Sequence, residues 1–464
     1  MSHDRRRPRD LTAARRVPIS MRDLLPEYSL TENSSPATQR NIPTRPARPC
    51  LRTCGIECEN LIKPGIGMRR HRRGTRTPVL QKPKGASWRM SSERRIVKET
   101  FDRLEADPAG AMSYFYGRLF AREPRMRALF PPAMGTQHDR FFHALTRIVW
   151  SQDSPEELTR HLGALGRDHR KYGVLREHYP AVETALIATV RTFAADVWTA
   201  EAEDAWTRAY RSAAATMIAA AGREGSGRPP WWVAEITGHD RRDHDLAVLT
   251  LRPERPLPFL PGQYVSVQTA RWPRVWRTYS VANAPRPDGS ISLHVRARPA
   301  GWVSGALVRH CAPGDTVLLG PAAGTMTLEP GSPRGLLLIG GGTGLAPMKA
   351  LAEQAAGTGR EVRLLVGART ERGLYDLAEL RRLESASARL RVVPVLSRSP
   401  GGPGGLHGRI PDVLPGFLDG VPGWEDHHAY AAGPVPLVRR TVTALQRHGM
   451  SLSRIHHDLL AAED

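Results

Sequence analysis

A glycine-rich turn constrains the fold of this chain more than any other feature. Residues 340–344 read Gly-Gly-Gly-Thr-Gly, between an apolar run at 336–339 and a helix predicted to start near Pro347. A buried strand that passes through glycines into a helix presents backbone N–H groups where phosphates bind. The segment therefore predicts an α/β nucleotide fold.

A second motif lies about sixty residues earlier, at Arg277-Thr278-Tyr279-Ser280. It offers a cation, an aromatic face and a hydroxyl within four residues. Arg277 can make bidentate contacts with a pyrophosphate, Tyr279 can stack on an isoalloxazine ring, and Ser280 can hydrogen-bond that ring. Together the two motifs suggest a flavin and a nicotinamide in adjacent modules, and so a redox protein.

The pattern around each motif fits these assignments. Residues 334–464 contain apolar runs at 336–339, 362–366, 392–396 and 428–431, with helical segments at 374–383 and 437–447, as expected of a parallel sheet. Residues 229–330 contain short strands separated by Pro and Gly, which predicts a small antiparallel barrel.

Residues 93–224 predict an all-α domain. Apolar residues recur there at helical spacing, and breaks fall at Asp107-Pro108, at residues 130–132, at Ser154-Pro155 and at residues 178–180. His169 closes the helix that begins near Pro155. A neutral imidazole in that position can serve as an axial haem ligand.

Residues 1–92 have the composition of a basic disordered extension. Residues 1–90 hold 20 Lys/Arg against 7 Asp/Glu, so most of the net charge of +21 lies there. Three interpretations stay open: a tail that binds nucleic acid or an anionic membrane surface, a solvated tail without a partner, or an over-extended start with Met90 as the true first residue. A nucleic-acid role is the less favoured.

The cysteines and the apolar runs limit the remaining classes. Cys50, Cys54 and Cys58 share a helical spacing, but a fourth ligand is not placed nearby, so a metal site there is disfavoured. Four cysteines do not make a disulfide framework in 464 residues. Without an 18-residue apolar run or a secretory signal, the sequence predicts a cytoplasmic protein and no membrane partner.

The helical block resembles the globin part of the bacterial flavohaemoglobins. The resemblance makes His169 the proximal iron ligand, places Tyr116 and Gln137 as distal residues around bound oxygen, and makes Tyr179 the support of His169. It also implies that Phe130 packs against the haem, and it places Phe141 in the haem pocket where the family usually has leucine, so a narrower distal pocket that favours small diatomic ligands is expected. Gln137 and His169 are 32 residues apart, the spacing of the family.

The rest of the chain resembles the ferredoxin-reductase superfamily in the order that flavohaemoglobins have. The resemblance implies an FAD site and a nicotinamide site. For FAD it implies Gln263, Tyr264, Arg277, Tyr279, Ser280, Val303 and Ser304, the last two from a GxVS turn that would hold phosphate. For NADH or NADPH it implies Gly340, Gly341, Gly342, Thr343, Gly344, Pro347, Arg369, Gly433 and Pro434. NADH is favoured, although Arg369 could receive a 2′-phosphate.

Three further positions depart from the family pattern. Ala221 stands where the family keeps a proximal glutamate, so His169 would lack a carboxylate partner. Ala432 replaces the cysteine of the Cys-Gly-Pro turn, and Leu460 stands near the place of an aromatic that stacks on the flavin. Easier access of nicotinamide to the flavin is expected, as is loose discrimination between coenzymes.

The resemblance implies the cofactors haem b, FAD and NADH or NADPH, and an oxidation of nitric oxide to nitrate by O₂ at a haem that NAD(P)H re-reduces through FAD. One alternative is an NAD(P)H-dependent flavin or haem reductase with another acceptor. A less favoured one is a haem redox or oxygen sensor whose tail binds DNA. The expected partners are small molecules, and the chain is expected to be a monomer or a homodimer.

Overall fold

The computed structural model describes residues 84–225, 227–399 and 405–458. The predicted extension up to residue 83, its three cysteines and Leu460 lie outside the described residues. Helix α1 (Lys84–Glu105) begins before the predicted domain start at residue 93, so the helical part of the chain starts earlier than the sequence indicated.

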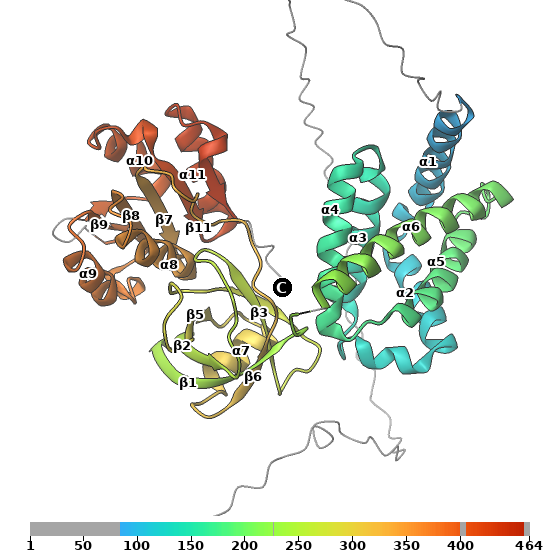
Figure 1. Ribbon diagram of the computed structural model, residues 1–464, viewed down its shortest axis with the longest axis horizontal. Helices are drawn as coiled ribbons and strands as arrows, with labels where there is room; N and C mark the ends of the chain where they lie inside the picture. The colour runs from blue at the N-terminus through green and yellow to red at the C-terminus, as the bar shows by residue number, and fades with distance from the viewer. Residues whose placement is uncertain (1–83, 226, 400–404, 459–464) are drawn as a thin grey trace, which may run out of the picture. The chain divides into compact units, whose positions relative to one another are not determined.

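The helical domain is built from six α-helices and several short 3₁₀ turns among the described residues (Figure 1). After α1 come α2 (Pro108–Arg122), α3 (Gly135–Trp150), α4 (Pro155–His169), α5 (Tyr179–Phe193) and α6 (Ala200–Gly225). The helix boundaries predicted at Asp107-Pro108 and Ser154-Pro155 are confirmed, because α2 starts at Pro108 and α4 starts at Pro155. The Asp107 carboxylate accepts a 2.9 Å hydrogen bond from the Gly110 N–H at the start of α2.

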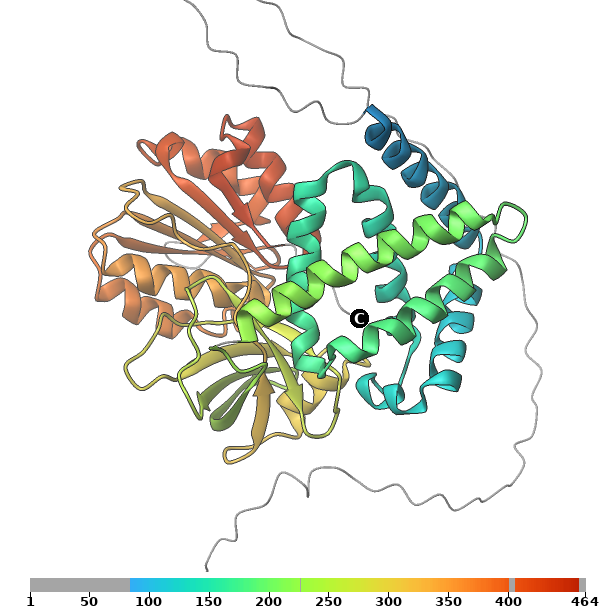
Figure 2. The same cartoon turned by 45° about the vertical axis from the view of Figure 1, so that its right-hand side comes forward.

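A single glycine brings α4 close to α6. A Cβ atom on Gly166 would lie 2.3 Å from the carbonyl oxygen of Met217, so only glycine permits this approach. In Figure 2 the long α6 crosses the bundle over α4. The close approach at Gly166 lies three residues before His169 and holds this end of α4 against α6. The helical core contains Phe101, Phe115 and Trp206, whose indole Nε1 donates to Thr100 Oγ1 at 2.8 Å.

The second domain is a nearly closed antiparallel barrel, as predicted. Its strands run in the order β4-β3-β6-β1-β2-β5, and a bridge between Val281 and Leu293 connects its two edges. The strands are β1 (Trp232–Asp243), β2 (Leu246–Pro253), β3 (Tyr264–Thr269), β4 (Arg277–Ser280), β5 (Ile291–Arg296) and β6 (Thr316–Leu319). Helix α7 (Trp302–Arg309) packs on the barrel with six successive buried residues.

The third domain is a parallel sheet in the order β10-β9-β8-β7-β11-β12. The strands are β7 (Leu336–Gly341), β8 (Val362–Ala368), β9 (Leu390–Leu396), β10 (Leu406–His407), β11 (His428–Ala432) and β12 (Ile455–His457). Both faces are covered: α8 (Leu345–Ala356) and α9 (Leu377–Ser385) lie on one, α10 (Ile410–Asp419) and α11 (Val435–Arg447) on the other (Figure 1). Every residue of β7 is buried, as a central parallel strand requires.

The helix expected at residues 374–383 is shorter than predicted. A 3₁₀ turn at Glu371–Gly373 precedes α9, and Leu374 and Tyr375 lie in the connection between them. Tertiary contacts of Tyr375 explain the difference, because its hydroxyl is bonded outside this segment. None of the helices in the described ranges is long and apolar enough to cross a membrane.

Candidate functional site

His169 ends α4 with one ring nitrogen already engaged. Its Nδ1 lies 2.7 Å from the carbonyl oxygen of Leu165, one turn earlier in the helix. A carbonyl accepts but does not donate, so Nδ1 carries the proton and Nε2 keeps its lone pair. Burial lowers the pKa of His169, which keeps the ring neutral at pH 7. A neutral imidazole with a free Nε2 is the form that binds iron, so this residue fits a haem.

The predicted distal residues come together. Gln137 on α3 donates from Nε2 to the Tyr116 hydroxyl on α2 at 3.4 Å. The Tyr116 ring also contacts Phe130 edge-on at 5.4 Å and stacks on His138 at 4.9 Å. Burial raises the pKa of Tyr116, so the phenol stays protonated. Because Gln137 donates to the phenol oxygen, the phenol proton remains available for a ligand.

Phe141 packs beside the distal residues, whereas the contacts of Tyr179 are with Tyr210. Phe141 lies 5.9 Å from Tyr116 between ring centroids and stacks on Phe115 at 4.6 Å, so it forms part of the same aromatic wall. Tyr179 begins α5, and its carbonyl accepts a 2.8 Å hydrogen bond from the Tyr210 hydroxyl. The roles of both residues at a haem stay predictions.

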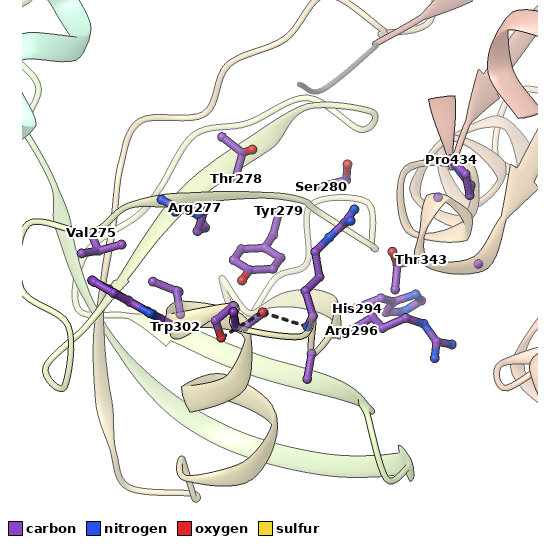
Figure 3. Close-up of a pocket in the computed structure, with 18 of the residues that line it drawn as sticks. Val275, Arg277, Thr278, Tyr279, Ser280, His294, Arg296, Trp302, Thr343 and Pro434 are labelled. Carbon is purple, nitrogen blue, oxygen red and sulfur yellow. Dashed lines mark hydrogen bonds between the residues drawn. The ribbon is translucent and has the colours of Figure 1, made fainter. Parts of the chain in front are cut away.

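A cavity of about 1020 Å³ joins the barrel and the α/β domain. Its size suits a dinucleotide. Figure 3 shows Tyr279 and Trp302 on the barrel side, with Thr343 and Pro434 on the other. The cavity is lined by the following residues predicted for the flavin and nicotinamide: Arg277, Tyr279, Ser280, Val303, Ser304, Gly341, Gly342, Thr343, Gly344, Gly433 and Pro434.

Five predicted residues do not line this cavity: Gln263, Tyr264, Gly340, Pro347 and Arg369. The Gln263 side chain is occupied within the protein, because its Oε1 accepts from the Leu260 N–H at 2.9 Å and its Nε2 donates to the Gly324 carbonyl at 3.1 Å. Gln263 therefore shapes the turn before β3. Arg369 is exposed at the end of β8.

The predicted phosphate-binding turn at residues 301–304 is the start of a helix. Gly301 precedes α7, and a Cβ atom there would lie 2.4 Å from Ser304 Oγ, so the turn requires glycine. The Ser304 hydroxyl accepts a 3.2 Å hydrogen bond from the Arg298 N–H. The N–H groups in the first turn of α7 lack partners within the helix, which makes this end suitable for a phosphate.

The glycines of the nucleotide turn are required by close packing. A Cβ atom on Gly344 would lie 2.4 Å from the Ala432 backbone, and one on Gly341 would lie 2.3 Å from the Leu437 side chain. Gly342 has φ +57° with open space around its Cα, and Gly433 has φ +141°. The backbone of β7 can thus approach β11 closely and leave an open cradle, which fits a nicotinamide dinucleotide.

Sequence reasoning missed His294, which lines the cavity from β5. Its Nδ1 lies 2.9 Å from the Tyr375 hydroxyl, and that hydroxyl lies 3.4 Å from the Gly342 carbonyl oxygen. The Asp376 carboxylate, 2% exposed, lies beside His294 and forms an ion pair with Lys349 at 2.9 Å. Ile291, Leu293 and Val295 of β5 pack in the barrel core, so alternation places His294 on the opposite face of the strand. Its contact with Tyr375, 81 positions away, has no local signal.

The buried His294 predicts an acid-dependent loss of stability. Burial lowers its pKa to about 4 from the ordinary value of about 6.5. A lowered histidine pKa means that its contribution to stability is complete above pH ~6.5 and is lost as the pH falls toward ~4, by roughly 3 kcal/mol. His294→Gln should flatten the urea-unfolding free energy between these pH values. Parallel pH profiles for the variant and the wild type would contradict this assignment.

Family models match each domain in turn. A globin model matches residues 113–217, an oxidoreductase FAD-binding domain matches residues 234–327, and an oxidoreductase NAD-binding domain matches residues 338–443. The chain is similar to the ferredoxin–NAD(P)⁺ reductase component of the naphthalene 1,2-dioxygenase/salicylate 5-hydroxylase systems of a Ralstonia species, with 32% identity over 48% of this chain and 67% of the relative. These matches define an NAD(P)H-dependent oxidoreductase joined to a globin.

Longer matches cover all three domains. A flavohaemoprotein of Bordetella pertussis is 28% identical over 79% of this chain and 97% of its own length. The fold is that of a flavohaemoglobin from Malassezia yamatoensis, a structure with bound FAD and haem, with a TM-score of 0.65 at 19% identity over 79% of this chain and 98% of that chain. The chain thus joins a globin to oxidoreductase FAD-binding and NAD-binding domains, as its flavohaemoprotein relatives do, and the cofactors of these domains are haem, FAD and a nicotinamide dinucleotide.

Proposed function

We propose that this flavohaemoprotein oxidises nitric oxide to nitrate with O₂, using electrons from NAD(P)H. When bound, the haem supplies the oxygen chemistry, and the FAD links the two-electron donor to the one-electron acceptor. The observation that carries the proposal is the distal pair: Gln137 donates to the Tyr116 oxygen and leaves the phenol proton free. A protonated donor in this place stabilises the partial negative charge that bound O₂ acquires.

The protein's own residues divide the remaining work. His169 would hold the iron through Nε2, and the Leu165 carbonyl keeps the proton on Nδ1. Arg277, Tyr279 and Ser280 of β4 would hold the flavin, and the amides at the start of α7 would bind phosphate. The turn at Gly341–Gly344 would hold the nicotinamide dinucleotide. NADH is the proposed donor, and a cytoplasmic location stays a prediction from the sequence.

The direct test follows nitric oxide, nitrate and NADH together in aerated solutions of the purified holoprotein. We expect nitric oxide to disappear only when NADH and O₂ are both present, with nitrate as the product. Initial rates with NADH and NADPH, compared in the wild type and in Arg369→Ala, then decide the coenzyme. Oxidation of NADH without faster loss of nitric oxide would refute the proposed reaction.

A second candidate is an NAD(P)H-dependent reductase that passes electrons to another acceptor. The contact between His169 Nδ1 and the Leu165 carbonyl favours this reductase function. A carbonyl that accepts the Nδ1 proton raises the basicity of the imidazole less than a carboxylate does. On α6, Ala220 lies against Gly163 of α4, and Met217 lies against Gly166. Ala221, which follows Ala220, brings no carboxylate to this part of α6. Under this function ferric acceptors would be reduced faster than nitric oxide is consumed.

Tyr116→Phe should release O₂ faster. The loss of a hydrogen bond to a partly charged ligand costs about 1.5–3 kcal/mol, which corresponds to a roughly 10- to 150-fold higher dissociation rate constant. Stopped-flow mixing of the dithionite-reduced protein with O₂ measures this rate constant. The matched control is Tyr114→Phe, because Tyr114 lies on the same helix but bonds to Thr192 instead. Equal O₂ release in Tyr116→Phe and the control would exclude Tyr116 as the donor.

A further inference from the structure

Two histidines on neighbouring strands face each other away from the residues assigned above. His428 begins β11 and His456 lies on the edge strand β12, next to Tyr430 in the parallel register. The His428 Nδ1 and His456 Nε2 atoms are 3.1 Å apart. Glu329, from the segment that leads into β7, places its carboxylate 3.5 Å from His428 Nε2.

The geometry points to a site for a divalent transition-metal ion of the zinc type, with His428, His456 and Glu329 as ligands. One ligand atom from each residue lies within 4.8 Å of the others. Zinc binds imidazole nitrogens at about 2.0–2.1 Å, so two nitrogens on one tetrahedral ion are roughly 3.3 Å apart. The distance between His428 Nδ1 and His456 Nε2 needs to increase by only a few tenths of an ångström for the ion to replace the proton between them.

The rings are held in this arrangement before any ion binds. The Tyr430 ring stacks on His456 at 4.6 Å, and the two histidine rings lie 5.3 Å apart at 26°. His428 is 4% exposed, whereas the Glu329 side chain is 53% exposed. The exposed glutamate can move onto an ion that enters from solvent.

The charges around the cluster set the strength expected of the site. Arg334 and Arg360 lie near His428, and their positive charges oppose a cation. The Glu329 carboxylate offsets part of that charge, and two imidazoles with one carboxylate are a ligand set that suits zinc. Beyond His456 the chain reaches Asp458, which lines the nucleotide cavity, so a bound ion would fix this last strand.

The other carboxylate–histidine group in the described residues is less suited to a metal. Asp243, His244 and Asp245 are consecutive residues at the turn from β1 to β2, and Asp243 is the last residue of β1. Asp245 accepts two hydrogen bonds from Arg296 at 2.6 and 2.7 Å, and Asp243 pairs with Arg372 at 2.7 Å. Both carboxylates are thus already engaged by guanidinium groups.

Zinc binding to the full-length protein with haem and FAD tests the site. Cys50, Cys54 and Cys58 are replaced by serine in every sample, so that thiolates do not add zinc. After treatment with EDTA, equilibrium dialysis against Zn²⁺ and elemental analysis should give one zinc per chain. X-ray absorption at the zinc edge should show two imidazole ligands.

Variants then locate the ion. His456→Gln and Glu329→Gln should each weaken zinc binding at least as much as the roughly 10- to 100-fold loss known for outer-shell partners of metal ligands. His407→Gln, at an exposed histidine of the same domain, should bind as the parent does. Flavin content and NADH–ferricyanide activity report whether each variant is folded. Failure of the parent to bind zinc, or equal binding by all folded variants, would reduce the cluster to a hydrogen-bonded histidine pair.

Discussion

His169→Ala should purify without haem and should not consume nitric oxide above the rate of haem-free protein. The reason is that His169 Nε2 is the nitrogen left free for iron, since Nδ1 is committed to the Leu165 carbonyl. The flavin and nicotinamide residues lie in other domains, so NADH should still reduce ferricyanide at the wild-type rate. The Soret absorbance and the pyridine haemochrome measure the haem content.

The control for this variant is His161→Ala. His161 lies on the same helix α4 two turns earlier and is partly buried as well. It should keep a full complement of haem, although burial lowers its pKa as it does for His169. A His169→Ala protein that retains haem with an unchanged spectrum would show that another residue holds the iron, and the proximal assignment would be wrong.

Gly344→Ala should lose most of its NADH-driven flavin reduction. The new methyl carbon would stand 2.4 Å from the Ala432 carbonyl group and the Gly433 nitrogen, which belong to backbone and cannot turn aside. Forcing β7 and β11 apart costs about 1–3 kcal/mol, and it moves the cradle that holds the dinucleotide. The expected fall in the second-order rate constant for NADH is therefore roughly 5- to 150-fold, measured by stopped-flow flavin absorbance.

Two comparisons separate a local effect from general damage in this variant. Gly357→Ala adds a methyl group in the same domain, where the nearest atom, the Gln354 carbonyl oxygen, is 3.8 Å away, and it should behave as wild type. Dithionite, which needs no nucleotide site, should still reduce both cofactors of Gly344→Ala. Normal reduction by NADH would mean that the turn does not carry the dinucleotide.

Local signals in the sequence predicted the elements well because each is fixed by nearby residues. Pro108 and Pro155 start helices where they were expected to, since proline fits the first turn of a helix and not its interior. The apolar run of β7 predicted a buried parallel strand for a similar reason. Resemblance to flavohaemoglobins then predicted the order of the domains.

The functional roles of single residues were harder to predict. Gln263 matched a flavin motif, yet its amide is bonded to Leu260 and Gly324 outside the cavity. The motif indicates that a turn is present, and here the glutamine side chain holds that turn; its role at a flavin stays a prediction. Arg277, Tyr279 and Ser280 do line the cavity, because β4 carries all of them along one short strand at its edge.

The sequence by itself determined the domain classes and the glycine-rich turn, since these depend on residues close together along the chain, and its resemblance to the flavohaemoglobins added the candidate iron ligand. Only the tertiary structure decided which distant side chains meet. Tyr116 and Gln137 are 21 positions apart, His294 and Tyr375 are 81 apart, and His428 and His456 are 28 apart. Such contacts are set by how helices and strands pack, and neither composition nor spacing encodes that packing locally.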